Sequence, residues 1–430
     1  MFIATLRLLA AQTYTSSPYF RFRTLYLPAR IAPLAVTAYT ATCAAGHGSE
    51  AIARALETRR GGLTDNTFST QPLECKIGRI ESLEQIVLPD ALARFDSRNH
   101  RLAWLGLNQD GFLDRAHALR ERVGAARIAL VLGTSTSSIG ETERAYRELD
   151  AQGRFRADQR RSEVHQPHAL GLFVQHALGL SGPCLTIATA CSSSAKVFAS
   201  AERLLRTGLA DAVVVGGVDT LCDSVLFGFN SLELVSRQAC RPFDANRSGL
   251  SLGEAAGFAI LERMPQSGKV EKAAKLLIGC GESSDAHHMS APHPQGAGAE
   301  RALDDALARA GIRADQVDYI NLHGTASRQN DEVEAALIAR RFPAATRASS
   351  TKGWTGHTLG AAGILEAAIS LIALERGLAP GLLTTRDLDP VCGPQIRIDN
   401  AEADLRIALS NSFGFGGNNC CLAFARADAL

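Results

Sequence analysis

Apolar residues in this chain gather into short continuous runs that alternate with longer stretches of mixed apolar and polar residues. The clearest runs are mainly aliphatic and lie at 128–132, 212–218, 256–261 and 275–278. Continuous rather than alternating runs of this kind predict strands that are buried on both faces of a sheet. A further strand is expected near the start of the chain, at 35–42.

Two longer stretches carry apolar residues at helical spacing. In 192–207, Ala195, Phe198 and Leu205 share one face, and 361–376 repeats the pattern. Helices that cover both faces of a buried sheet make a layered α/β protein. We therefore predict an α/β fold, in which each half of the chain contains a small-residue loop that leads directly into an amphipathic helix.

The composition restricts the function and the location. The 430 residues are 46% hydrophobic and 21% charged, with a formal net charge of +1. This near-neutral balance argues against a dedicated nucleic-acid binder, and no apolar run reaches the ~20 residues that span a bilayer. The ten cysteines form no C-x-x-C pair, which argues against a zinc site and favours free thiols in a reducing compartment such as the cytoplasm.

Residues 1–33 have a different character. No Asp or Glu occurs before Glu50, whereas Arg7, Arg21 and Arg23 do. An acid-poor leader with arginines is typical of a mitochondrial transit peptide. The alternative, which we favour, is an N-terminal extension that arises from a start codon placed too early. In either case we expect the folded part to begin near residue 34.

The first candidate for chemistry is Cys191, in the segment TIATACSSSA at 186–195. A strand-like run ends at this cysteine and a helix begins at once. The partial positive charge and the free N–H groups of a helix start favour a thiolate, and a backbone N–H at the turn could face a developing oxyanion. Taken alone, the segment fits a buried structural cysteine equally well.

Two further segments place histidines beside glycine and hydroxyl residues. NLHGTAS at 321–327 carries His323, and STKGWTGHTLGAAG at 350–363 carries Lys352 and His357. A histidine at a strand end suits proton transfer or polarisation of a carbonyl, although each could also be a structural residue of a turn. A fourth segment, NSFGFGGNN at 411–419, is a glycine-rich turn before the last strand. Neither a phosphate loop nor a dinucleotide fingerprint occurs in the sequence.

Together and in this order, the four segments resemble the β-ketoacyl-acyl-carrier-protein synthase family. RPFDANRSGLSLGEAAG at 241–257 and SSDAHHMSAPHPQGAG at 283–298 add to the resemblance. It implies the thiolase fold, in which two similar βα halves stack in five layers, α-β-α-β-α. We expect one half at 34–280, with the nucleophilic cysteine, and the other at 281–430, with the catalytic histidines.

The resemblance also assigns roles to the residues of the reaction centre. Cys191 is implied to be the acylated nucleophile. His323 and His357 are implied to bind and polarise a malonyl thioester and to assist its decarboxylation. Lys352 would order this site, and Glu366 matches the buried acidic residue that the family carries on the following helix.

Other residues are implied to shape the pocket. The backbone N–H groups of Cys191 and Phe415 would form the oxyanion hole, and Phe415 would also gate the nucleophile. Thr325 and Ser327 match the positions that hydrogen-bond the phosphopantetheine arm. Thr136 matches the position whose size sets the depth of the acyl tunnel, on a loop that reaches across a dimer interface.

The implied activity is decarboxylative Claisen condensation of an acyl group held on Cys191 with malonyl-acyl-carrier protein, in the synthesis of fatty acids or related polyenes and polyketides. Decarboxylation supplies the carbon nucleophile, so the scheme requires neither a metal nor a soluble cofactor. The implied partners are acyl carrier protein and a second ketosynthase-like chain, in a homodimer or a heterodimer. Because carrier proteins are acidic, we expect a basic patch at the pocket mouth, with Arg98 and Arg101 as candidates.

Some features depart from the family's usual pattern. Ser327 stands where a second threonine is common, and Trp354 is bulkier than the usual residue; the loop around it looks more like enzymes of polyene-pigment pathways. Two other interpretations stay open. One is a catalytically silent chain-length partner, a class that usually lacks the nucleophile. The other is a thiolase acting on coenzyme A thioesters, which would place a late cysteine in a C-x-G setting that Cys420 and Cys421 lack.

Overall fold

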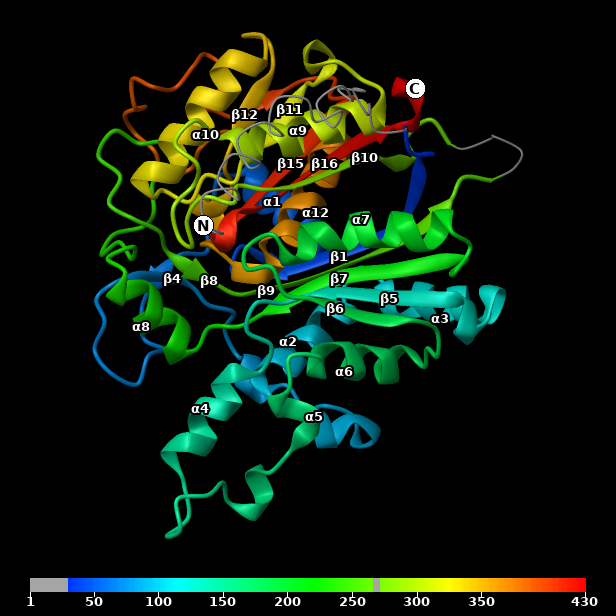
Figure 1. The fold of residues 1–430 in the computed structure, drawn as a ribbon, viewed down its shortest axis with the longest axis vertical. Coiled ribbons are helices and arrows are strands. Elements are labelled where there is room, and N and C mark those ends of the chain that lie inside the picture. Colours follow the sequence, from blue (N-terminus) through cyan, green and yellow to red (C-terminus); the bar gives the residue numbers. More distant parts are fainter. Residues whose placement is uncertain (1–29, 266–270) are drawn as a thin grey trace, which may run out of the picture.

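A computed structural model describes residues 30–265 and 271–430 (Figure 1). The N-terminal extension, up to residue 29, lies outside the described residues. The secondary structure expected from the apolar pattern is confirmed to within a few residues. The four aliphatic runs are β5 (Ile128–Gly133), β7 (Ala212–Asp219), β9 (Ala255–Arg263) and β10 (Lys275–Ser284), and the two helical stretches are α7 (Ser193–Arg206) and α12 (Ala362–Arg376).

The strands form one extended sheet made of two similar halves. Its other main strands are β1 (Leu34–Cys43), β6 (Cys184–Ile187), β11 (Tyr319–Asn321), β12 (Arg347–Ser349), β15 (Ile407–Gly414) and β16 (Asn418–Arg426). In one half β6, β5 and β7 run parallel, and β9 and β1 continue antiparallel. The other half repeats this order with β12, β11 and β15 parallel, and β16 and β10 antiparallel.

The two halves are joined along a short edge. β1 and β10 share two residue pairs, Leu34 with Leu277 and Ala35 with Leu276, whereas β1 pairs with β9 along most of its length. β10 therefore belongs to the second half of the sheet, and the expected boundary at 280/281 falls inside this strand.

Helices cover the outer face of each half, and two helices lie between the halves. The outer helices of the first half are α2 (Arg98–Leu107), α3 (Phe112–Val123) and α6 (Ala169–Leu178), and those of the second are α9 (Ala297–Ala310) and α10 (Arg328–Arg341). Each set buries its apolar residues against its own strands. α7 and α12 fill the space in the middle, which makes the five layers that the resemblance implied (Figure 1).

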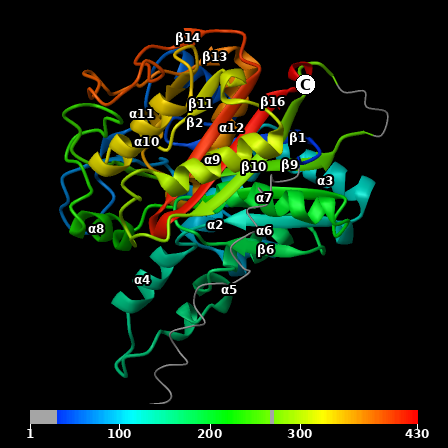
Figure 2. The same ribbon diagram turned by 45° about the horizontal axis from the view of Figure 1, so that its top comes forward.

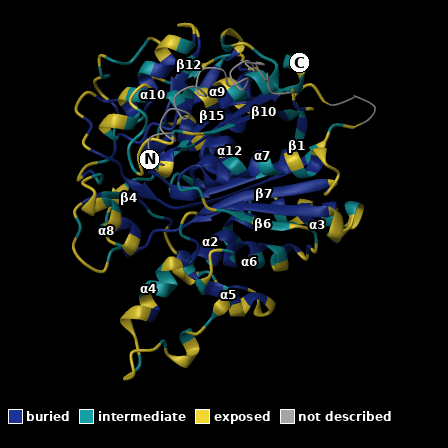
Figure 3. Ribbon diagram, viewed as in Figure 1, coloured by how far each residue is buried: buried dark blue, intermediate teal, exposed yellow. Residues whose placement is uncertain are grey.

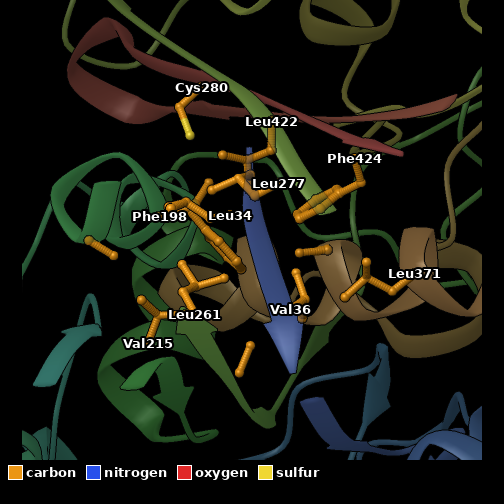
Figure 4. Close-up of a cluster of buried hydrophobic side chains, with 14 of the residues drawn as sticks. Leu34, Val36, Phe198, Val215, Leu261, Leu277, Cys280, Leu371, Leu422 and Phe424 are labelled. Carbon is orange, nitrogen blue, oxygen red and sulfur yellow. The ribbon is translucent and has the colours of Figure 1, made fainter. Parts of the chain in front are cut away.

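The core between the halves explains why the strand runs are continuous. β5 and β7 are buried along their whole length (Figure 3). In the middle layer Phe198 of α7 meets Phe424 of β16 edge to face, with ring centroids 5.7 Å apart. Leu371 of α12 and Val215 of β7 belong to the same cluster (Figure 4). Strands with helices on both sides have no solvent face, so polar residues do not alternate along them.

The two central helices approach each other most closely near their starts. A Cβ on Gly363 of α12 would lie 2.4 Å from the backbone nitrogen of Ala195 in α7, so this contact requires glycine. The backbone N–H of Ile364 also donates to Oγ of Ser194 at 2.9 Å. The loops that precede the two helices are thereby brought together, and these loops carry Cys191 and His357.

Shorter elements surround the layers. They are α1 (Ser49–Glu57), α4 (Ile139–Arg147), α5 (Ser162–His165), α8 (Asp223–Ser231), α11 (Lys352–Thr355), β2 (Gly46–His47), β3 (Thr64–Asp65), β4 (Lys76–Gly78), β8 (Leu252–Gly253), β13 (Leu378–Ala379) and β14 (Ala401–Glu402). α4 and α5 form an arm that projects from the body in both views (Figures 1 and 2). Within 30–265 and 271–430, no helix is long and apolar enough to cross a membrane.

Candidate active site

Cys191 lies in a turn between β6 and α7. The strand ends at Ile187, earlier than the sequence suggested, and the helix begins at Ser193. Between them Ala190 takes a left-handed φ of 52°, a conformation that few non-glycine residues adopt. This turn leaves Cys191 5% exposed, with its side chain on the wall of a cavity.

Two histidines from the second half of the chain meet this cysteine. His323 follows β11 and His357 follows α11. Nε2 of His357 lies 2.9 Å from Sγ of Cys191. The two imidazole rings are 5.5 Å apart and nearly perpendicular, at 86°. All three side chains are buried, so the three sequence segments converge on one enclosed point.

Lys352 and Glu366 lie behind the histidines. The Nζ of Lys352 donates to the backbone oxygen of His323 at 2.5 Å and forms an ion pair with Glu366. Burial raises the pKa of Glu366, and the charge of Lys352 opposes the rise. The same Nζ lies 3.5 Å from Nδ1 of His323. Because an ammonium group can only donate, Nδ1 holds the lone pair and the ring proton of His323 lies on Nε2.

Burial controls the protonation of the reacting groups. It lowers the pKa of both His323 and His357 well below the usual range, and the charge of Lys352 lowers them further. It raises the pKa of Cys191 to about 11, against the opposing effects of Lys352 and the backbone N–H of Phe415.

Burial thus opposes our expectation that the helix start favours a thiolate at Cys191, because it disfavours the charged form. These shifts favour a thiol and a neutral imidazole in the resting pair. Sγ of Cys191 and Nε2 of His357 lie within hydrogen-bond distance, close enough for a proton to pass between them.

A cysteine and two histidines can also ligate zinc. The ligating atoms of Cys191, His323 and His357 lie within 4.8 Å of one another, the one such group in the described part of the chain. However, the ammonium of Lys352 beside His323 disfavours a second cation at this point. The arrangement is better suited to moving protons and donating to a carbonyl oxygen.

The cavity that reaches these residues has a volume of about 460 Å³. Thr325 and Ser327 lie on its wall, and their hydroxyl groups are 2.9 Å apart. Phe415, in the turn between β15 and β16, also lines it, and its ring stacks on Phe229 of α8 with centroids 5.6 Å apart. The cavity wall thus offers hydroxyl groups, and Phe415 lines the same cavity as Cys191.

Thr136 does not line this cavity within the single chain. Its Oγ1 donates to Oδ1 of Asp219 at 2.9 Å, so the hydroxyl has a partner inside its own subunit. The loop that carries it ends three residues later at the start of the projecting helix α4. A role in tunnel depth would therefore depend on a second chain that packs against this loop.

Arg98 and Arg101 lie away from the cavity and are held in ion pairs. Arg98 keeps 15% of its side chain exposed, pairs with Glu84 and donates to the buried Glu254 at 2.5 Å. Arg101 makes two hydrogen bonds of 2.6 Å to Asp96. Because these charges are neutralised within the chain, the structure does not support a docking role for either arginine.

Two other exposed arginines lie on or next to segments that line the cavity, and the sequence motifs did not single them out. Arg328, the first residue of α10, lines the cavity itself. Arg237 follows Ser236, whose Oγ lies 2.8 Å from that of Ser248 on the cavity wall. Both side chains are exposed. They are better placed than Arg98 and Arg101 to meet an acidic partner.

Trp354 takes no part in the cavity. It is fully buried, and its Nε1 donates to the backbone oxygen of Ala55 in α1 at 3.3 Å. Its neighbours are the apolar residues of α1, β1 and α12. The bulky residue in this loop therefore fills the core and does not line the cavity.

Comparison with known proteins agrees with this geometry. Residues 93–267 match the beta-ketoacyl synthase N-terminal domain, and residues 275–386 match the C-terminal domain. Nodulation protein E of Rhizobium meliloti (strain 1021) is 36% identical over 308 residues, which cover 70% of this chain and 76% of that protein. The 3-oxoacyl-[acyl-carrier-protein] synthase 2 of Staphylococcus aureus (strain COL) is 31% identical over 318 residues, which cover 71% of this chain and 76% of that protein.

A solved structure extends the likeness to the whole fold. The ketosynthase ApeO, in complex with its chain length factor ApeC from Xenorhabdus doucetiae, matches with a TM-score of 0.83 and 35% identity over 96% of this chain and 99% of that chain. The fold and the buried Cys–His–His site define the class of thiolase-fold condensing enzymes. Within that class, the chain belongs to the β-ketoacyl synthase family.

Replacement of His357 should change how the reactivity of Cys191 depends on pH. In the wild type a neutral imidazole accepts the thiol proton, so alkylation by iodoacetamide should vary little between about pH 6 and pH 8. In His357→Ala the reaction depends on free thiolate, whose fraction rises about tenfold per pH unit below the pKa of the thiol. Peptide mass spectrometry measures the rate at Cys191 itself.

The exposed His47 on β2 supplies the control, since His47→Ala should keep the wild-type profile. A profile in His357→Ala that stays as flat as that of the wild type would exclude His357 as the base for Cys191.

Proposed function

We propose that this enzyme transfers an acyl group from acyl carrier protein to Cys191 and condenses it with malonyl-acyl-carrier protein, in the synthesis of fatty acids or related polyenes and polyketides. The observation that carries the proposal is the 2.9 Å contact between Sγ of Cys191 and Nε2 of His357, with His323 beside it in an enclosed site. A thiol next to a base, with donors for an oxyanion, is the requirement for covalent acyl transfer.

In the first step the proton of Cys191 moves to Nε2 of His357 as Sγ attacks the thioester carbonyl. The carbonyl oxygen becomes an oxyanion, which the backbone N–H groups of Cys191 and Phe415 would stabilise. Donors of this kind are each worth roughly 10²–10³ in rate. The tetrahedral intermediate then expels the pantetheine thiolate, which takes the proton back from His357.

In the second step malonyl thioester loses CO₂. The electron pair of the broken C–C bond passes into an enolate, whose oxygen needs donors. The Nε2–H of His323 is fixed for this task because Lys352 occupies the side of Nδ1. His357 becomes a second donor once Cys191 is acylated, because Nε2 no longer accepts from Sγ and the ring proton can move from Nδ1 to Nε2. The enolate carbon then attacks the acyl carbonyl and releases the thiolate of Cys191, which takes up one proton from water.

The cavity wall suits a substrate held on a long polar arm. Thr325 and Ser327 can hydrogen-bond the phosphopantetheine of a carrier protein, and the name of the Staphylococcus aureus relative includes acyl-carrier-protein. The substrates bring their own activating thioester, so the scheme uses no soluble cofactor and no metal.

We place a related ketosynthase-like subunit against β6 and the arm. β6 is the last strand of the sheet, so one edge of its backbone is open to pairing. Leu185 on this strand and Tyr146 and Leu149 on the arm are 43%, 65% and 40% exposed. The solved complex of ApeO with its chain length factor supports a heterodimer, in which the loop of Thr136 would meet the partner. Native mass spectrometry separates this form from a homodimer, the alternative.

We assign the protein to the cytoplasm. All ten cysteines fall within the described residues, and each is a free thiol, as expected in a reducing compartment. A mitochondrial location would instead require residues 1–33 to act as a transit peptide, and N-terminal sequencing of the mature protein decides between the two.

The first test separates acylation from decarboxylation. Cys191→Ala should carry no acyl adduct. His323→Ala should still be acylated, because His357 remains as base, but its release of CO₂ from malonyl-acyl-carrier protein should fall by roughly 10²- to 10³-fold. Intact-mass spectrometry follows the adduct, and labelled malonyl groups report the CO₂.

His357→Ala is the comparison, and it should lose both half-reactions. A stable adduct on Cys191→Ala would move the nucleophile to another residue. Undiminished CO₂ release from His323→Ala would remove His323 from the reaction.

The second test concerns carrier docking. Arg237→Glu and Arg328→Glu together should raise the KM for carrier-bound substrates, more so at low salt, because charge steering is screened by ions. Small thioester mimics should react at the wild-type rate. Arg313→Glu is the control, since this exposed arginine precedes β11 at the opposite end from His323. Equal losses with carriers and mimics would exclude a docking role for the pair.

A further inference from the structure

Asp219 is a buried carboxylate between two loops of the active site. It is the last residue of β7 and is 0% exposed. It does not line the cavity, and its charge takes no part in the proposed chemistry. Its surroundings nevertheless connect the two sides of the reaction centre.

On one side Asp219 holds the loop 134–136. Oδ1 accepts from Oγ1 of Thr134 at 2.5 Å and from the backbone N–H of Thr136 at 3.1 Å. Oδ2 accepts from the backbone N–H of Ser135 at 2.8 Å and from its Oγ at 2.7 Å. This loop is packed against the helix of the nucleophile, because a Cβ on Gly133 would lie 2.4 Å from the backbone nitrogen of Ser194.

On the other side Asp219 holds the loop that follows His357. The backbone N–H of Gly360 donates to Oδ2 at 2.6 Å, and it lies 3.3 Å from Oγ of Ser135. A Cβ on Gly360 would stand 2.5 Å from the backbone nitrogen of Ser135. Leu359 has a φ of 57°, which is strained for a leucine and persists only where the surroundings hold it.

We propose that Asp219 is a positioning residue that clamps the His357 loop to the loop 134–136 and thereby sets the contact between His357 and Cys191; the inference rests on the proposed role of His357 as base. An ionised carboxylate can only accept, and here both of its oxygens face donors. An asparagine could not accept at both positions, because its NH₂ group is a donor. In one orientation the NH₂ would face the backbone N–H of Thr136, and in the other it would face those of Ser135 and Gly360.

The test uses the alkylation of Cys191 by iodoacetamide, which needs no carrier protein or acyl substrate. Asp219→Asn should slow the reaction at neutral pH by roughly 10- to 100-fold, the usual effect of a small misplacement of a reacting group. It should also make the rate rise with pH as in His357→Ala. The double variant with His357→Ala should be no slower than His357→Ala alone, because both act on one contact. Asp219→Glu, which keeps the carboxylate, should recover part of the rate.

Gly360→Ala disturbs the same contact from the other loop and should reproduce the slow, pH-dependent alkylation, so the proposal stays testable if Asp219→Asn does not fold. The matched control is Asp110→Asn. Asp110 accepts from Thr40 and from the backbone N–H of Ser49, away from these loops, and its loss should leave alkylation unchanged.

A wild-type pH profile in folded Asp219→Asn or Gly360→Ala, even with lower thermal stability, would overturn the proposal and leave Asp219 a purely structural role. The proposal would also be overturned if the reductions in alkylation rate caused by Asp219→Asn and His357→Ala multiplied in the double variant. Failure of the proposed condensation would show separately, as an absence of acyl adduct and CO₂ release in the wild type.

Discussion

The close contact between the starts of α7 and α12 is the constraint on which the site depends. Gly363 lets the second helix approach the backbone of Ala195 to a distance that any side chain would prevent. The loops before the two helices carry Cys191 and His357, so one packing contact in the middle layer brings the nucleophile and its base together. The sheet halves on either side then enclose the pair.

That enclosure determines the chemistry of the site. In water a histidine is partly charged near neutral pH and a thiol is partly ionised a little above it. Here burial makes both charged forms unfavourable, which favours a neutral resting pair joined by the contact between Sγ and Nε2. The charge of Lys352 is balanced by Glu366. Its ammonium group faces Nδ1 of His323, which favours the tautomer with the ring proton on Nε2. The two histidines are therefore not equivalent, since His357 begins as an acceptor and His323 as a donor.

Much of this could be predicted from the sequence. The continuous aliphatic runs predicted β5 and β7, because apolar and polar residues do not alternate along a strand that is covered on both faces. Cys191, His323 and His357 stood out because each lies in a distinctive segment and the segments occur in a family order. The order of the motifs located the chemistry, and the apolar pattern located the sheet.

Other properties depend on contacts between residues that are distant in sequence. Arg98 looked free in a basic stretch, but its partner Glu254 lies 156 residues further along the chain. Asp219 carries no motif, and its importance is visible only when two loops are folded around it. The pKa of Cys191 follows from burial, which the helix-start argument did not include. Trp354 stood out in the sequence only by its size, and the fold shows that it fills the core.

The neutral state of the Cys191–His357 pair can be tested by ultraviolet difference spectroscopy, since a thiolate absorbs where a thiol does not. The spectrum of the wild type minus that of Cys191→Ala should show no thiolate band between about pH 6 and pH 8, and a band should develop only as the pH approaches the thiol pKa of about 11. A difference band that corresponds to one full thiolate at pH 7 would contradict the neutral pair and would show that an ion pair activates Cys191.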